Sequence, residues 1–273
     1  MALVLLPPSE GKTAATSGPT FDINSLAFPA LCDTRRRVAD ALIATCQLPD
    51  DQALSILKVG SSVLNEVHQT ANLFSSPCAP AAELYTGVLY DAAHLTPSDT
   101  ALIFSGLFGI TRASDLIPLY RLSMGVKLPS IGSVLSIWKK SLKSLTLQDL
   151  QAIVGSQDNV VFDARSSTYQ VWTGQSPAST RNEGTNRTAT HSTAATPEFP
   201  YNDSPFPFWT LRAVNSNGRV ITHRAKYYRG LMTRALLDAG SMCNAQVPEV
   251  AKSLGFSRVT VREDSREITI VVD

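Results

Sequence analysis

The chain has 273 residues, of which 44% are hydrophobic and 17% are charged, and its formal net charge is +1 at pH 7. A charge this close to zero excludes a protein that binds nucleic acid through a basic field over its whole surface, so such binding requires a local cluster of cations. No apolar run approaches the roughly 20 residues that span a bilayer, and Leu3–Leu6 is too short for a secretory leader. We expect a cytoplasmic protein with no membrane partner, folded as one domain over residues 1–273.

The N-terminal segment predicts a buried strand followed by a loop that carries charge. Leu3–Leu6 is entirely apolar, and Pro7-Pro8 ends the strand. Gly11-Lys12-Thr13 matches the end of a phosphate-binding P-loop, but the leading glycine of that motif is absent and the two prolines remove N–H donors. These differences argue against a standard nucleotide triphosphatase. What remains is a strand-end loop that presents Ser9, Glu10 and Lys12, either as part of a site or as an ordinary solvated loop.

Helical patterns fill Asp33–Cys46 and Asp51–Phe74. The second region reads as two helices joined by a tight turn at Lys58-Val59-Gly60, which has the form of a helix-hairpin-helix element. Such elements contact phosphate through N–H groups without reading bases. Many helical hairpins contain a glycine, so an ordinary structural turn is the alternative. We predict Lys58 and Gly60 as DNA-binding residues, with an affinity that is modest and sensitive to salt.

The segment Ala101–Leu128 follows neither the helical nor the strand period after its first residues. Ala101–Phe104 predicts a strand buried on both faces, and Gly106 and Gly109 loosen the backbone beyond it, where open α/β sheets bind ligands. Six residues then combine charge with aromatic and flexible side chains: Arg112, Asp115, Tyr120, Arg121, Met124 and Lys127. Arg112 and Asp115 have the spacing of a local ion pair. Arg121 and Lys127 require an anion from elsewhere, either a distant side chain or a ligand phosphate.

The second half of the chain adds a strand at Val160–Phe162, followed by Asp163, Arg165, Ser166 and Tyr169. Residues 173–207 are rich in Ser, Thr, Asn, Gly and Pro, which predicts a mobile insertion. Asn217-Gly218 predicts a hairpin turn between strands at Thr210–Val214 and Val220–Thr222. Arg258–Arg262 and Glu267–Val272 predict a second hairpin that closes the chain.

A helix from Arg224 places Lys226 and Arg229 side by side beside Gly230. Two like charges at this spacing destabilise a helix unless an anion lies between them, and a glycine inside a helix costs about 0.5–1 kcal/mol. Two unfavourable choices on one face indicate a site. The alternative is a solvated basic face on which Gly230 admits a neighbouring strand.

Five blocks of sequence carry a family resemblance. They are LLPPSEGK (Leu5–Lys12), LYTGVLY (Leu84–Tyr90), the segment Ala101–Leu128, VVFDARSSTY (Val160–Tyr169) and HRAKYYRGLM (His223–Met232). In this order they resemble the YaaA peroxide stress protein family, whose long signature precedes a Trp-containing helix, here Val134–Leu145. The family's Arg-Pro-Leu-Asp is Arg112-Ala113-Ser114-Asp115 here, and its Asn-Leu-Ala-Ser is Asp163-Ala164-Arg165-Ser166, which changes the charge at a predicted site.

The resemblance implies a site role for Lys12, Glu10, Lys226 and Arg229. It also implies a helix-hairpin-helix motif, binding of DNA, and protection against peroxide and iron damage. It favours the predicted helical module at Lys58 and Gly60 over an ordinary turn.

We predict an α/β fold with α+β character, in which helices flank a central mixed sheet. The main hypothesis is one cationic crevice that binds DNA or a phosphate-bearing small molecule, and the alternative is an enzyme for a small anionic or nucleotide-like substrate. The predicted ligand-binding residues are Ser9, Lys12, Arg112, Tyr120, Arg121, Lys127, Arg165, Lys226 and Arg229. The candidates for proton transfer are Glu10, Asp115 and Tyr169. The four cysteines and four histidines are dispersed, so we predict no metal and no cofactor.

Overall fold

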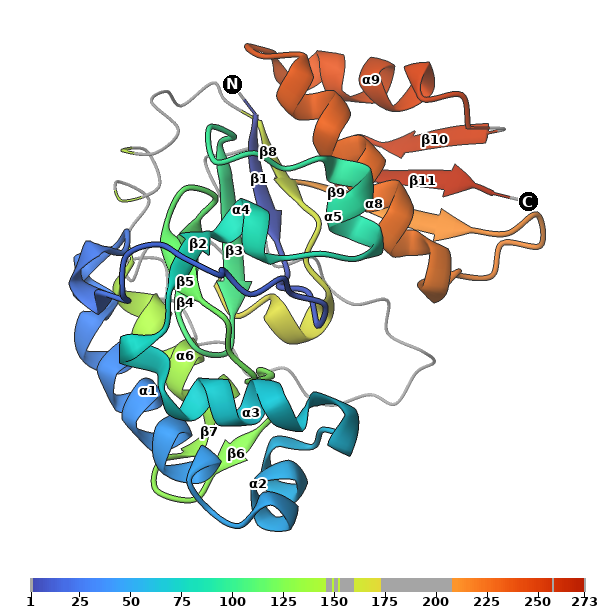
Figure 1. Cartoon of the computed structure of the whole chain (residues 1–273). Coiled ribbons are helices and arrows are strands. Elements are labelled where there is room, and N and C mark those ends of the chain that lie inside the picture. Colours follow the sequence, from blue (N-terminus) through green and yellow to red (C-terminus); the bar gives the residue numbers. More distant parts are fainter. Residues whose placement is uncertain are drawn as a thin grey trace, which may run out of the picture.

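The computed structural model describes residues 2–145, 149, 152, 160–172, 208–256 and 258–272. The insertion predicted at residues 173–207 lies outside these residues. The centre is a mixed seven-stranded sheet in the order β10-β11-β9-β8-β1-β3-β4, which confirms the predicted α/β class (Figure 1). The strands are β1 (Leu3–Leu6), β3 (Ala101–Ser105), β4 (Gly109–Arg112), β8 (Val161–Asp163), β9 (Phe208–Val214), β10 (Arg258–Arg262) and β11 (Glu267–Val271).

The middle of the sheet is parallel and fully buried. β1 lies between β3 and β8, with Val4 opposite Ala101 and Leu3 opposite Val161. All residues of these three strands are buried, as expected for parallel strands that are covered on both faces. Because β1 and β8 run in the same direction, the loops after them leave from the same edge of the sheet. The amide of Ala164 donates to the carbonyl of Leu5 at 2.9 Å, which joins the two loops at their start.

Helices form two groups around this sheet. α5 (Val88–Ala93), α8 (Thr222–Asp238) and α9 (Val247–Ser253) lie over one face, and α1 (Cys32–Cys46), α2 (Asp50–Leu57), α3 (Leu64–Ala71) and α6 (Val134–Ser141) gather at one end (Figure 1). The remaining short elements are α4 (Ala81–Leu84), the pair β2 (Cys78–Pro80) with β5 (Leu116–Pro118), and the pair β6 (Lys127–Leu128) with β7 (Gly132–Ser133). Single 3-10 turns occur at Ile23–Ser25, Pro29–Leu31, Ser61–Val63, Leu73–Ser75, Leu142–Ser144, Ser167–Tyr169 and Asn244–Gln246.

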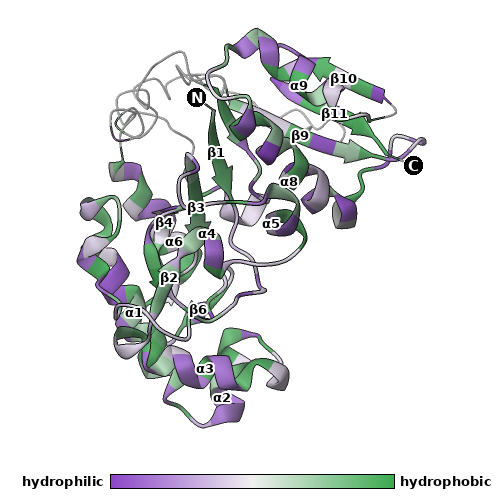
Figure 2. Ribbon diagram, turned by 45° about the horizontal axis from the view of Figure 1, so that its top comes forward, coloured by the Kyte–Doolittle hydropathy of each residue, from purple (hydrophilic) through white to green (hydrophobic). Residues whose placement is uncertain are grey.

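Hydropathy follows this arrangement. The central strands are hydrophobic along their length, whereas α1, α2 and α3 alternate between polar and apolar residues (Figure 2). Within the part of the chain that the structure describes, no helix has both the length and the apolar character needed to cross a membrane.

The two glycines after β3 make a hairpin, which corrects the expectation that they open a ligand crevice. β4 runs back antiparallel to β3, with Gly109 opposite Ser105. Gly109 has φ +71°, and a Cβ there would collide with the ring of Trp138, whose Nε1 donates to the carbonyl of Gly106 at 2.7 Å. The glycines are therefore required for chain reversal and for packing of α6.

A buried arginine that the sequence analysis did not identify holds this hairpin. Arg35 of α1 is completely buried, and its guanidinium donates to the carbonyls of Phe108 at 2.9 Å and Ile110 at 2.6 Å. Burial lowers the pKa of Arg35 to about 10, which leaves it charged at neutral pH. The cation serves the fold, because its donors are used by backbone carbonyls.

The strand predicted at Val220–Thr222 does not form. The turn at Asn217-Gly218 forms, but Val220 makes a single bridge to Val214 and α8 begins at Thr222. β9 instead pairs in parallel with β8 and β11. β10 and β11 form an antiparallel pair at the end of the chain, with Arg262 opposite Glu267.

Candidate functional site

A cavity of about 570 Å³ lies where the loops after β1 and β8 meet α8 and the turn between α2 and α3. Several segments that are distant in sequence line it: the loop from Pro7, the turn at Lys58–Gly60, the run from Tyr120 to Val126, the residues after β8, and α8. The predicted site residues among its lining are Ser9, Glu10, Lys12, Lys58, Gly60, Tyr120, Arg121, Tyr169, Lys226 and Arg229.

The loop after β1 is held by the segment Leu84–Tyr90. Lys12 forms an antiparallel bridge with Tyr85, and the amide of Thr13 donates to the carbonyl of Leu84 at 2.8 Å. The hydroxyl of Tyr90 donates to the carbonyl of Pro7 at 2.7 Å. The LYTGVLY segment therefore acts as the support of the Lys12 loop. This segment carries the family resemblance, but its sequence alone does not indicate a role in the site.

Lys12 has an unusual environment for a lysine. Its Nζ donates to the carbonyl of Ser9 at 2.8 Å and lies 4.8 Å from the ring centroid of Tyr120. Burial and, to a smaller extent, the charge of Arg121 lower the pKa of Lys12 to about 7. Among the described residues, no carboxylate lies within ion-pair distance of this amine. Ammonium and neutral amine are therefore both accessible near neutral pH, the first being favoured by the carbonyl and the ring face.

The rings of Tyr85 and Tyr120 lie against the amine of Lys12, and a third tyrosine, Tyr169, lines the cavity. The hydroxyls of Tyr85 and Tyr120 are 2.6 Å apart, and both residues are buried. Burial raises the pKa of both, as it does that of Tyr169, which lines the cavity directly. All three hydroxyls therefore keep their protons at neutral pH, and Tyr169 can donate a hydrogen bond or a proton to a group in the cavity.

Arg121 has the distant carboxylate that its own segment lacks. Its guanidinium contacts Glu66 of α3 at 2.6 Å and donates to the carbonyl of Glu10 at 2.6 Å. Its amide also donates to the hydroxyl of Thr70 at 3.1 Å. The anion that Arg121 requires is therefore a distant side chain, Glu66, and not a ligand phosphate. Arg121 joins α3 to the Lys12 loop.

α8 contributes two cations without carboxylate partners. Among the described residues, neither Lys226 nor Arg229 forms an ion pair, and the Nε of Arg229 is buried without a hydrogen-bond partner. Burial lowers the pKa of Arg229, and Asp163 acts in the opposite direction. Because unpartnered buried donors are uncommon in native proteins, the Nε of Arg229 points to a missing acceptor.

Gly230, next to these cations, is explained by helix packing. An added Cβ there would overlap the carbonyl of Leu89 and approach the Cβ of Ala92 to 2.7 Å. The close neighbour is therefore α5, which replaces the expected strand or ligand.

The turn between α2 and α3 opens onto the same cavity. Lys58 ends α2 in the left-handed conformation at φ +57°, and its Nζ donates to the carbonyl of Gly125 at 3.4 Å. Gly60 has an ordinary φ of −82°, and an added Cβ would meet only the hydroxyl of Ser62 at 3.9 Å. Packing therefore gives no reason for a glycine at this position. The turn therefore forms part of the wall of the cavity.

Arg112 and Asp115 do not line the cavity. Because β4 runs antiparallel, Arg112 lies opposite Leu102 near the beginning of β3, at the other end of the sheet. Its guanidinium contacts Asp115 at 3.4 Å, as the spacing suggested. The buried carboxylate of Asp115 also accepts from the amides of Ala27 at 3.1 Å and Arg112 at 3.0 Å. Asp115 is a buried acceptor for the backbone, far from the candidate proton-transfer site.

Arg165 and Lys127 also lie outside the cavity lining. Arg165 is completely buried, with its guanidinium at 2.8 Å from Asp163 and 4.1 Å from the ring centroid of Phe104. It also donates to the carbonyl of Trp172 at 3.0 Å. The two charged residues that replace the family's Asn and Ala in this block, Asp163 and Arg165, therefore form an ion pair with each other. Lys127 is exposed at the start of β6.

Metal ligands are sparse around the cavity. The structure's described residues contain no group of three or more His, Cys, Asp or Glu side chains that could hold a metal ion. The chemistry that the lining offers is recognition of anions by ammonium, guanidinium and tyrosine hydroxyl groups.

The fold and the site together define an α/β protein with a cavity at the carboxyl ends of parallel strands, lined by cations from separate segments. Comparison with known proteins identifies the family: the model of "Peroxide stress protein YaaA" matches residues 2–188, and the chain belongs to this family. A UPF0246 protein of Streptomyces coelicolor is 32% identical over 267 residues, which cover 93% of this chain and 90% of that protein. A UPF0246 protein of Corynebacterium efficiens is 33% identical over 282 aligned positions, covering 99% of this chain and 100% of that protein.

Proposed function

We propose that the chain acts in the response to peroxide stress by binding phosphate groups in the cavity, with DNA as the preferred phosphate-bearing ligand. Binding of DNA there would protect it against peroxide and iron damage. The observation that carries the proposal is the meeting of Lys12, Lys226 and Arg229 at one cavity without carboxylate partners among the described residues.

The charge balance at the cavity supports an anionic ligand. Of its two nearby glutamates, Glu66 is engaged with Arg121, and Glu10 is exposed at the rim. Lys12 and Arg229 are partly buried, and holding cations in a partly desolvated space costs stability unless a negative ligand lies beside them. A phosphate offers oxygens for several such donors at once.

The turn at Lys58–Gly60 favours DNA over a small molecule alone. Backbone N–H groups at a helical turn are suited to phosphate and carry no information on base sequence. Gly60 leaves the backbone bare where a sugar-phosphate chain would approach. We expect binding that is independent of base sequence and weakens steeply with salt.

The test is fluorescence anisotropy of labelled duplex and single-stranded oligonucleotides over a range of salt concentrations. Lys226→Ala with Arg229→Ala is expected to weaken binding by about 10- to 100-fold and to reduce the slope of log K against log salt by about 2. The matched control is Lys139→Ala with Lys140→Ala, which removes two cations from the exposed end of α6. If both double variants lose the same amount of affinity, the protein attracts DNA only through its general positive charge, and the proposed site is overturned.

An enzyme acting on a small anionic or nucleotide-like substrate is the second candidate. It is supported by the pKa of Lys12 near 7, which lies in the range useful for proton transfer, and by the nearby hydroxyl of Tyr169. A thermal-shift screen of nucleotides and sugar phosphates tests it. Stabilisation by such a compound, lost on Lys226→Ala with Arg229→Ala, identifies the ligand class.

A further inference from the structure

We propose that Lys12 is a nucleophile that forms an imine with an aldehyde carried on a phosphate-bearing ligand. The inference rests on the proposed function, because the unpaired cations of the cavity would bind the phosphate and leave the aldehyde beside the amine. It goes beyond binding, since it assigns a covalent step to a single atom, the Nζ of Lys12.

The position of Lys12 supports this role. Its backbone is fixed by the bridge to Tyr85, and its amine is fixed by the hydrogen bond to Ser9 and the ring of Tyr120. The amine faces a cavity of about 570 Å³, which can hold a sugar-sized group. Lys58, Lys226 and Lys12 are the lysines of the cavity lining, and the other two are exposed.

Burial, more than the charged groups around it, lowers the pKa of Lys12. Arg121, on the segment after Tyr120, lowers the pKa of Lys12 in addition to burial. Glu66 of α3 and Glu10 of the same loop act in the opposite direction, and the tyrosines at the cavity stay protonated. With a pKa near 7, about half of the amine is neutral at pH 7, whereas an ordinary lysine is almost fully protonated.

The reaction needs no oxidant, reductant or metal. The lone pair of Nζ forms a bond to the carbonyl carbon, and the carbonyl oxygen receives a proton as the nitrogen loses one. The C–O bond of this intermediate then breaks, the oxygen leaves as water with a second proton, and the nitrogen lone pair completes the C=N bond. Tyr169 donates the proton to the departing oxygen and is restored by the proton released from nitrogen.

Two probes separate the sources of such an aldehyde: glyceraldehyde 3-phosphate, and a duplex oligonucleotide with one abasic site. Each is incubated with the full chain, reduced with sodium borohydride to fix the imine, and located by peptide mass spectrometry. We expect an adduct at Lys12 that is at least about 10-fold more abundant than at any other lysine and increases from pH 6 to pH 8. Adduct with the sugar phosphate alone assigns a small-molecule ligand, and adduct with the oligonucleotide alone assigns DNA.

Lys12→Arg should abolish the adduct after its yield is divided by the fraction of ligand bound, and Lys139→Arg, at the exposed end of α6, should leave that normalised yield at Lys12 unchanged. Anisotropy with the intact oligonucleotide, which has no aldehyde, is measured in parallel. Binding without an adduct at Lys12 overturns the imine and leaves the proposed function standing. Failure of both binding and trapping overturns both proposals. An adduct spread evenly over the surface lysines overturns the imine proposal alone.

Discussion

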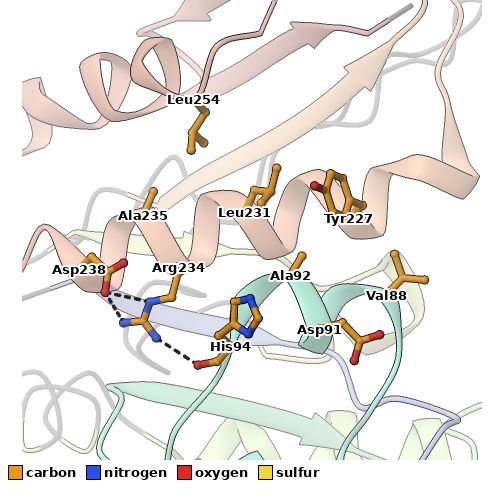
Figure 3. Close-up of a pocket in the computed structure, with 10 residues that line it drawn as sticks. All are labelled: Val88, Asp91, Ala92, His94, Tyr227, Leu231, Arg234, Ala235, Asp238 and Leu254. Atoms are coloured by element: carbon orange, nitrogen blue, oxygen red, sulfur yellow. Dashed lines mark hydrogen bonds and ion pairs between the residues drawn. The ribbon is translucent and has the colours of Figure 1, made fainter.

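Two hollows of nearly equal volume lie on opposite sides of α8, and they treat their cations differently. The groove in Figure 3, of about 560 Å³, is lined mainly by apolar and charged residues of α5 and α8, with Leu254 just after the end of α9. Its arginine, Arg234, contacts Asp99 at 3.1 Å and Asp238 at 2.8 Å. In the cavity of about 570 Å³ on the other side, Lys226 and Arg229 have no carboxylate partner among the described residues. This difference is the reason that we propose a ligand for the cavity and none for the groove.

The helical period explains how one helix serves both hollows. Tyr227, Leu231 and Arg234 recur at intervals of four and three residues and face the groove, whereas Lys226 and Arg229 face the cavity. Volume therefore does not identify the site on α8. The pairing of the arginines is the better guide, because Arg234 is neutralised by two carboxylates, whereas the buried Nε of Arg229 has no acceptor among the described residues.

The largest expected effect concerns a paired and an unpaired arginine. Arg165→Met leaves the buried carboxylate of Asp163 without its cation, so the free energy of unfolding should fall by about 3–5 kcal/mol. Arg229→Met removes a guanidinium that forms no ion pair with any described residue, and the free energy of unfolding should change by less than about 1 kcal/mol. Urea denaturation followed by circular dichroism measures both.

The rescue is Asp163→Asn with Arg165→Ala, which restores the family pattern at both positions. This double variant should recover more than half of the stability that Arg165→Met loses. If Arg165→Met and Arg229→Met are equally destabilising, the distinction between paired and unpaired cations does not hold.

The second prediction concerns the glycine that separates the two hollows. Gly230→Ala places a methyl group against the carbonyl of Leu89, so α5 and α8 must move apart. We expect a loss of about 1–3 kcal/mol of stability despite the better helix propensity of Ala. Gly60→Ala is the matched control, because its Cβ has only ordinary contacts and its φ suits any residue, and its midpoint in urea should equal that of the wild type.

Much of the fold could be predicted because its core elements have clear periods. The apolar runs at Leu3–Leu6 and Ala101–Phe104 became adjacent parallel strands, and the helices at Asp33–Cys46 and after Arg224 lie where the pattern indicated. The strand β4 was missed because Gly109–Arg112 is short and the sequence after it has no period. That single antiparallel strand carries Arg112 and Asp115 away from the cavity.

The site was harder to predict because proximity in sequence says little about pairing. Arg121 finds Glu66 from a helix 55 residues earlier, and no pattern within either segment indicates that contact. Arg165 and Asp163 are two residues apart, yet the sequence analysis read Arg165 as a ligand-binding residue and did not recognise the buried pair. Tyr85 and Tyr90 have structural roles that only the folded position of the Lys12 loop reveals.

The last prediction, and the one that best separates the cavity from the groove, concerns the pH dependence of stability. The pKa of Lys12 is about 7 in the folded chain and near its ordinary value of 10.5 in the unfolded chain. Between these values the unfolded state binds more protons, so this group makes the folded state more stable as the pH rises from 7 to 10.5. Below pH 7 both states carry the proton, and the full cost of burying the charge applies.

Lys12→Met should remove that pH dependence and raise, or leave unchanged, the denaturation midpoint at pH 7, while its binding of phosphate ligands falls. Arg234→Met in the groove should lower the stability slightly and leave oligonucleotide binding unchanged. The charge of Arg234 is already neutralised by Asp99 and Asp238, so it is not available to a ligand. Denaturation series at pH 7, 8.5 and 10 with anisotropy at pH 7 measure both variants. A Lys12→Met chain that is less stable at pH 7 and keeps its affinity would assign Lys12 to the structure, and the cavity would then differ from the groove only in Lys226 and Arg229.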